Sequence, residues 1–287
     1  MDNDLTVYAK GAAFEDGVYD LRSLELVVSA YRSILDGLVA VQMGRRRLPA
    51  KTKRQLNYDV TINNGSIELL IDFVLNHPEI IGVLSDGGGY QLSAYITKLY
   101  RDAINLREAA ASFIEKGLTF DIKIVNSFNF GSHNTQVAIE DSEIIIPDPK
   151  ILFAAQTTRA PTDRVLRKMD GDRLKKIDLI SGEEKFTLDR EKRSILGRDK
   201  QILPARLKIV GRLDMVAFSA HRGEIVSDGE RYPVTWTDEI RTKMHKVADH
   251  EGVQFTVQPI IDHSRLSTEA IGFHVLDCEN PQHRMDL

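Results

Sequence analysis

The C-terminal part of the chain constrains the fold most, because strands of alternating apolar and polar residues are interrupted there by one amphipathic helix. The first strand is predicted from Arg206 to Phe218, and Gly211 near its middle is typical of a bulge or bend in a barrel strand. The elements expected after it are strands at Glu224–Val226 and Tyr232–Thr235, a helix at Asp238–Asp249, and strands at Val253–Ile261 and Ala270–Leu276. We therefore predict that residues 204–287 form a small β-barrel-like domain with five strands and one helix.

This order of elements, with a long bent first strand, resembles that of the OB fold. The resemblance covers only this part of the chain, and it rests on element order without a sequence motif. An SH3-like barrel or a small α+β sandwich is the alternative that the same order allows.

The resemblance also implies candidate binding residues. OB folds that bind single strands combine a basic groove with aromatic rings on which bases stack. The residues of the predicted barrel that fit this description are Arg206, Lys208, Arg212, Arg231, Tyr232 and Trp236. Side chains alternate between the two faces of a strand, so one of Tyr232 and Trp236 can belong to the core, and core packing is the interpretation that we favour for these rings.

Residues 1–157 are predicted to form an α+β domain, because strands and helices do not alternate regularly along them. A strand at Leu5–Lys10 precedes a long helix that Asp20 caps, and a second long helix is expected at Leu92–Lys116. Between the helices, Asn63-Asn64-Gly65 is a strong hairpin-turn signal with alternating residues on both sides.

The end of this first domain is predicted from weaker patterns. Gln136–Ile146 resembles one strand, and Lys150–Gln156 a short helix. Residues 158–203 are expected to be a charged connector with short strands of its own at Ile177–Ile180 and Lys185–Leu188.

Composition excludes some classes of protein. The hydrophobic fraction is 42% and the charged fraction 28%, as in ordinary globular proteins. A single cysteine, Cys278, gives no disulfide framework and fits a reducing compartment. We expect a cytoplasmic protein without a membrane partner, because the start of the chain does not resemble a signal peptide and no apolar run is long enough to cross a bilayer.

Charge is uneven along the chain. Six basic residues lie within Arg45–Arg54, and a second basic stretch runs from Arg159 to Lys208. Both stretches are explained by solvated loops or helix faces, and the sharper hypothesis is an anionic partner such as a nucleic acid or a phosphorylated ligand.

No motif of a catalytic or metal-binding class is evident. The glycine loop Asp86–Gly89 lacks the Lys-Ser/Thr end of a P-loop, and Ser132 beside His133 in the loop Phe128–Asn134 is not a catalytic pair. The eight histidines include no HExxH pair, and one cysteine cannot form a CxxC motif. We therefore assign no catalytic residue, no metal ligand and no cofactor.

Three functional hypotheses remain open from the sequence. The first is a non-enzymatic binding or regulatory protein whose barrel recognises nucleic acid or a partner protein. The second is an interaction scaffold that forms homo-oligomers through its long helices and binds no nucleic acid. The third is an enzyme whose site is assembled from dispersed residues around Asp86–Gly89 and Phe128–His133.

Overall fold

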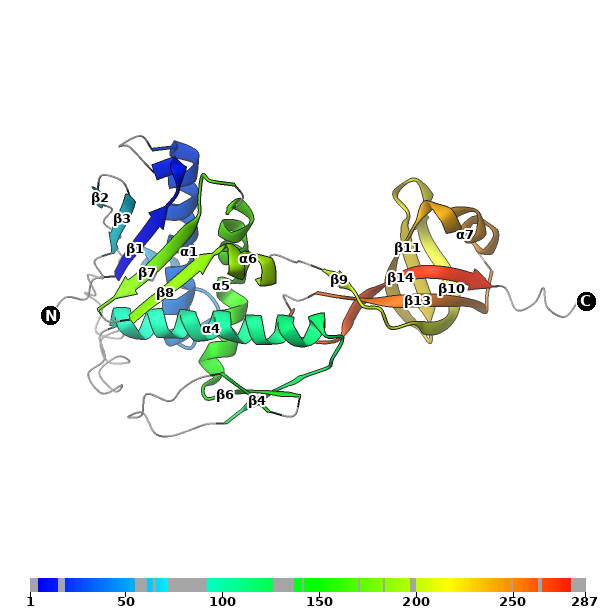
Figure 1. Ribbon diagram of the computed structural model, residues 1–287. Helices are drawn as coiled ribbons and strands as arrows, with labels where there is room; N and C mark the ends of the chain where they lie inside the picture. Colours follow the sequence, from blue (N-terminus) through cyan, green and yellow to red (C-terminus); the bar gives the residue numbers. More distant parts are fainter. Residues whose placement is uncertain are drawn as a thin grey trace, which may run out of the picture. The chain divides into compact units, whose positions relative to one another are not determined.

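The chain is a mixed α+β protein that divides into two compact units. The computed structural model describes residues 5–14, 19–54, 61–63, 66–71, 92–125, 137–140, 142–169, 171–182, 184–196, 200–248, 250–262 and 265–279. The N-terminal unit comprises Met1–Ser112 and Phe120–Arg198, and the C-terminal unit comprises Asp199–Leu287 with the short segment Phe113–Thr119. Both are drawn in Figure 1, and each is considered below by itself.

The N-terminal unit is built on an antiparallel five-stranded sheet. Its strand order is β2-β3-β1-β7-β8. The strands are β1 (Leu5–Lys10), β2 (Thr61–Asn63), β3 (Ser66–Ile71), β7 (Lys176–Ser181) and β8 (Glu184–Asp189). The predicted hairpin is confirmed for β2 and β3, where Thr61 pairs with Glu68 and Asn63 with Ser66. Its turn residues Asn64 and Gly65 lie outside the described part of the chain.

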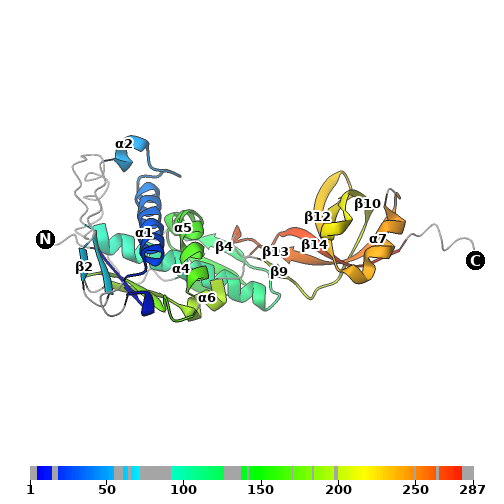
Figure 2. The ribbon, with the colours of Figure 1, turned by 90° about the horizontal axis from the view of Figure 1, so that it is seen from above.

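Helices cover one face of this sheet, as Figure 2 shows for α1, α4 and α5. The helices described in the unit are α1 (Leu21–Gln42), α2 (Ala50–Lys53), α4 (Leu92–Glu115), α5 (Pro149–Lys168) and α6 (Arg190–Leu196). Asp20 caps α1 as predicted, because its carboxylate accepts the Ser23 backbone N–H at 3.2 Å. Val7, Leu179 and Phe186 lie side by side across three strands and are buried on the covered face.

Most of the segment expected to be a connector, residues 158–203, lies in the N-terminal unit, and the two short strands expected in it are present as β7 and β8. The predicted short helix continues as α5 to Lys168, and β7 lies between β1 and β8 in the five-stranded sheet. Pro161 lies inside α5, where proline is normally taken to end a helix. Polar residues are buried along the same helix, including Thr158, Thr162 and Asp163, so its apolar spacing is incomplete.

A second correction concerns Gln136–Ile146, which was expected to be one strand. The structure has two strands there, β5 (Ala138–Glu140) and β6 (Glu143–Ile146), joined at Ser142. Ser142 has a φ of 73°, a turn conformation that ends β5 and lets the chain reverse. With β4 (Asp121–Ile124), these strands form a small sheet of order β4-β6-β5.

A buried carboxyl group in α4 makes the stability of the N-terminal unit depend on pH. The Asp102 side chain is 5% exposed, and burial raises its pKa from 3.8 to about 6, although Arg101 lies 3.7 Å away. The folded state therefore favours the protonated form. The stability contributed by this group is present below about pH 4 and is lost as the pH rises through about 6.

We accordingly expect Asp102→Asn to stabilise the protein at pH 8. The pKa difference corresponds to a gain of up to about 3 kcal/mol in the free energy of unfolding, because asparagine carries no charge to desolvate. The gain should shrink below pH 6 and vanish near pH 4. Urea unfolding of both proteins at several pH values measures it, and a gain that does not change with pH would contradict the assignment.

The C-terminal unit is a closed five-stranded β-barrel with one helix. The five strands are β10 (Leu207–Ala217), β11 (Arg222–Ser227), β12 (Glu230–Trp236), β13 (Val253–Ile261) and β14 (Ala270–Glu279). The barrel order is β10-β11-β12-β14-β13, and it closes because β10 also pairs with β13. A short helix, α7 (Arg241–Val247), lies between β12 and β13 in the chain, and a short strand, β9 (Gln201–Ile202), pairs with the end of β13. The predicted barrel-like module is confirmed.

Gly211 lies where β10 changes partners. The strand pairs with β13 up to Gly211 and with β11 from Arg212 onward. A Cβ atom at Gly211 would lie 2.3 Å from the carbonyl oxygen of Val226, so the strands approach too closely there for any side chain. The register irregularity itself comes later, between Asp214 and Ala217. The predicted bend and the bulge are thus neighbouring features of one strand.

Candidate interaction surface of the barrel

The two aromatic residues proposed for base stacking belong to the interior of the barrel. Tyr232, Val234 and Trp236 alternate on β12 with outward residues, and Trp236 is only 4% exposed. The Tyr232 ring is partly buried, packs on the same core and meets the Phe273 ring edge-on at 5.3 Å between centroids. Its hydroxyl donates to the Glu230 carboxylate at 2.6 Å. Neither ring lies flat on the outer surface.

The four basic residues proposed with them do not share one site. Arg206 and Lys208 are exposed, and no ion pair of theirs is found among the described residues. Lys208 lies on the part of β10 that pairs with β13, whereas Arg212 lies on the part that pairs with β11. Arg212 and Arg231 do come together, because Val226 pairs with both of them across neighbouring strands.

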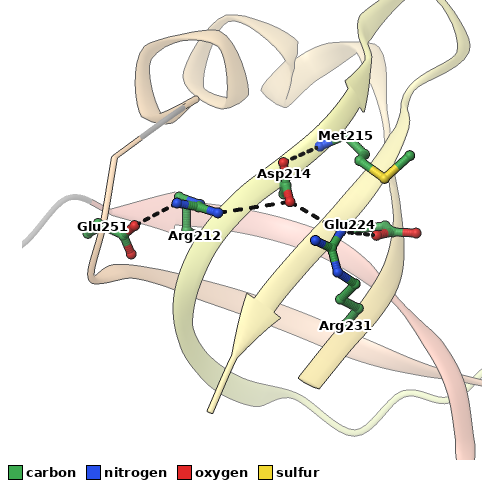
Figure 3. Close-up of polar contacts among 6 residues, drawn as sticks. All are labelled: Arg212, Asp214, Met215, Glu224, Arg231 and Glu251. Atoms are coloured by element: carbon green, nitrogen blue, oxygen red, sulfur yellow. Dashed lines mark hydrogen bonds and ion pairs between the residues drawn. The ribbon is translucent and has the colours of Figure 1, made fainter. Parts of the chain in front are cut away.

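Arg212 and Arg231 belong to a row of alternating charges, which we call the ion-pair row (Figure 3). Its members are Glu251, Arg212, Asp214, Arg231 and Glu224. The nitrogen-to-oxygen distances along it are 2.9 Å from Arg212 to Glu251, 4.0 Å from Arg212 to Asp214, 3.2 Å from Arg231 to Asp214 and 3.0 Å from Arg231 to Glu224. The hydrogen bond from Arg231 to Glu224 and the charge of Asp214 raise the pKa of the guanidinium.

The ion-pair row leaves little positive charge free. Both arginines contact two carboxylates each, so three acids surround two bases. Exposed pairs of this kind add little stability, roughly 1 kcal/mol or less each, but a network fixes the side chains in place. The row is therefore an ordered, locally neutralised surface on the outside of β10, β11 and β12.

Two exposed apolar side chains lie on β10 beside this row. Met215 is 69% exposed and Val210 is 56% exposed. Met215 has a φ of 47°, a left-handed conformation that costs an L-residue roughly 1–2 kcal/mol. The Asp214 carboxylate supports it by accepting the Met215 backbone N–H at 2.9 Å (Figure 3). The bulge of β10 thus projects a methionine to solvent, next to the ion-pair row.

The overall charge of this part of the chain is not basic. Residues 199–287 contain 11 Lys and Arg residues and 14 Asp and Glu residues. A surface that binds nucleic acid mainly through phosphates needs an excess of positive charge. The barrel does not have one.

In the described part of the chain, no cluster of three or more His, Cys, Asp or Glu residues could hold a metal ion. Burial raises the pKa of the Cys278 thiol to about 11, so its thiolate is scarce at neutral pH. The loops at Asp86–Gly89 and Phe128–Asn134 lie outside the described residues. None of the helices described is both long and apolar enough to cross a membrane.

Sequence reasoning missed the acidic half of the ion-pair row and Met215. Arg212 and Asp214 are two residues apart, a spacing that places both on one face of a strand, so this pair could have been recognised. Glu251 and Glu224 come from other elements, and only the folded barrel brings them close. In comparisons with known proteins, no family model matches the chain, and no curated protein or solved structure matches it significantly.

Proposed function

We propose that the chain is a non-enzymatic binding protein whose barrel binds a partner protein through the outer face of β10, β11 and β12. The observation that carries this proposal is the pair of exposed apolar side chains on β10, Val210 and Met215, which are close in sequence to Arg212 and Asp214 of the ion-pair row. Protein interfaces are enriched in methionine and arginine around an apolar centre with a polar rim. The partner would present an apolar pocket flanked by polar groups.

We also propose that the barrel is of the OB type rather than the SH3 type. Three features support this: the strand order, the parallel pairing of β12 with β14, and the helix between the third and fourth barrel strands. OB folds bind ligands on the face of their second and third strands. Those strands correspond to β11 and β12, which carry Glu224 and Arg231 of the ion-pair row.

A protein partner fits this face better than a nucleic acid does. Stacking of bases requires exposed rings, and Trp236 is buried while Tyr232 packs on the core. Phosphate binding requires free cations, and Arg212 and Arg231 already contact carboxylates.

The proposal predicts that acidic residues on this face abolish capture of one specific partner. A tagged full-length Val210→Glu/Met215→Glu variant and the wild type are each used to isolate bound proteins from the cells that produce the chain. The captured amount of at least one protein should fall about tenfold or more. A carboxylate buried unpaired in the interface weakens binding by more than the roughly 1.4 kcal/mol that this factor represents.

A matched control distinguishes specific binding at this surface from nonspecific hydrophobic association. Ile202 and Leu207 are 45% and 46% exposed and lie outside the face described here, on β9 and on the start of β10. The variant Ile202→Glu/Leu207→Glu should keep the partner. A partner lost equally from both variants, or no protein lost from the first, would argue against the proposal, and a lost protein that is a second copy of the chain would identify a homo-oligomer.

A further inference from the structure

A second surface, at the C-terminal end of α1, carries a dense group of cations. Six basic residues lie between positions 45 and 54, and residues 37–54 contain no acid. The set is Arg45, Arg46, Arg47, Lys51, Lys53 and Arg54, and all six are exposed. We call them the α1-end cations.

The segment that carries these cations is held in place by its backbone and by two buried anchors. The Arg45 N–H donates to the Ala40 carbonyl at 2.8 Å, and Gly44 takes the left-handed conformation, with a φ of 66°, that ends α1. Leu48 is 6% exposed and Thr52 is 7% exposed. The cations therefore project from a folded support.

Among the described residues, an acidic partner is found for one of the α1-end cations. Lys53 lies 3.1 Å from Asp36, and no ion pair or hydrogen bond of the other five side chains is found within the described residues. Lys150, at the start of α5, adds a further ammonium group close by, since it donates to the Gln42 side chain at 3.0 Å.

The other basic stretch, Arg159–Lys208, differs in this respect. Several of its cations contact acids, in the pairs Arg159–Asp163, Lys176–Asp178, Lys185–Asp178 and Lys192–Glu108. Burial raises the pKa of Asp178, but hydrogen bonds from Thr187, Lys185 and Lys176 outweigh it and lower the pKa. Among the described residues, acidic side chains therefore neutralise several cations of Arg159–Lys208 but only one of the α1-end cations.

The helix dipole alone does not account for the α1-end cations. A helix C-terminus favours cations in its last turn by roughly 0.3–1 kcal/mol, and the effect fades beyond that turn. Arg45, Arg46 and Arg47 follow α1 directly, but Lys51 and Arg54 belong to the next element, α2, and to its end. A group of five unpaired cations repels itself unless an anion binds it.

We propose that the α1-end cations bind the phosphate backbone of a nucleic acid without reading its bases. Four of the six are arginines, whose guanidinium groups contact phosphates with two parallel hydrogen bonds. Contacts to phosphates position a nucleic acid but carry no sequence information. An anionic membrane is the less suitable partner, because Leu48, the apolar residue of the loop, is buried and cannot insert into lipid.

Fluorescence anisotropy with the full-length protein tests this site. Labelled duplex and single-stranded DNA of two unrelated sequences are titrated at about 50 and about 200 mM salt. If five phosphates are contacted, duplex affinity should fall about 500-fold between these conditions, because each contact releases about 0.9 counterion. Both sequences should bind alike.

Two triple variants with the same change in charge locate the binding. Arg45→Ala/Arg46→Ala/Arg47→Ala should weaken binding at least tenfold and reduce the salt slope by about 2 to 3. Arg206→Ala/Lys208→Ala/Arg222→Ala removes three exposed barrel cations. Its DNA affinity and the salt dependence of that affinity should stay within about twofold of the wild-type values. Both variants should unfold thermally like the wild type, since all six side chains are exposed.

Four results would overturn the proposal: no binding at the lower salt, an equal loss in both triple variants, a strong preference for one sequence, or binding to phosphatidylserine vesicles without binding to DNA. The last would instead assign the cations to a membrane surface. The proposal for the barrel face rests on Val210, Met215 and the ion-pair row, and neither triple variant changes any of these residues.

Discussion

Asp163→Asn is expected to lower the free energy of unfolding of the N-terminal unit by about 3–5 kcal/mol, the usual cost of removing one partner of a buried ion pair. Asp163 on α5 is 8% exposed at its side chain, and Arg107 on α4 is 5% exposed. Their atoms Oδ1 and Nη2 lie 2.5 Å apart, and Arg159 contacts the other carboxylate oxygen at 3.4 Å. Without the carboxylate, Arg107 remains a buried and uncompensated charge.

A second variant keeps this prediction from being confused with simple loss of packing. Replacing both partners, Arg107→Met with Asp163→Leu, should recover much of the lost stability, because no buried charge is left. Arg107 Nη1 is buried and has no hydrogen-bond partner among the described residues, so removing it also removes an unsatisfied donor.

The chain supplies its own internal control for this experiment. Trp236 is the only tryptophan and lies in the barrel core, so tryptophan fluorescence reports unfolding of the barrel, while circular dichroism reports both units. The Asp163 variant should shift the circular dichroism transition and leave the fluorescence transition in place. A double variant that is no more stable than Asp163→Asn would contradict the account.

Trp236→Ala is expected to destabilise the barrel by about 3–5 kcal/mol, as truncation of a buried tryptophan usually does. The ring is 4% exposed and belongs to the barrel core together with Leu213, Phe255 and Val275. Its Nε1 has no hydrogen-bond partner in the part of the chain that the structure describes, so Trp236→Phe should cost much less, about 1.5 kcal/mol or below. Urea unfolding followed by circular dichroism measures both.

Tyr232→Phe is the matched control for this prediction. It removes only the exposed hydroxyl contact with Glu230, which is worth roughly 1 kcal/mol or less. If Trp236 served instead to stack bases, Trp236→Ala would leave stability unchanged and weaken nucleic-acid binding by about 1–3 kcal/mol. That outcome would contradict the core role.

The barrel could be predicted from the sequence because its signals are local. The strands β10 to β14 alternate inward and outward residues, as Val253, Phe255 and Val257 do on β13, and turns such as Asp228-Gly229 separate them. Gly211 could be recognised as a bend from its place in a long strand, although only the structure shows which strands it joins.

The five-stranded sheet could not be predicted in the same way, because its pairings are distant in sequence. β1 pairs with β7, and nothing near Thr6 indicates that Ile180 lies opposite to it. The length of α5 was hidden by Pro161, which is normally a helix breaker, and by Asp163, whose burial depends on Arg107 of another helix.

The candidate site was predicted only in part, for a related reason. Residue type alone identified Arg212 and Arg231 as surface cations, but it did not show that Asp214 and Glu224 neutralise them. Alternation left the faces of Tyr232 and Trp236 undecided until the barrel fixed which side of β12 faces the core. Nothing in the sequence indicated that the Met215 side chain is exposed, because its exposure depends on the left-handed conformation at the bulge of β10.

Photo-crosslinking from position 215 tests the central claim, a protein-binding face on the barrel, most directly. A photoreactive amino acid replaces Met215 in the full-length protein, and in a control it replaces Thr242, an exposed residue of α7. The account predicts one dominant protein adduct from position 215 in the cells that produce the chain, and none of that adduct from position 242. The same adduct from both positions, or only nucleic acid bound at position 215, would contradict it.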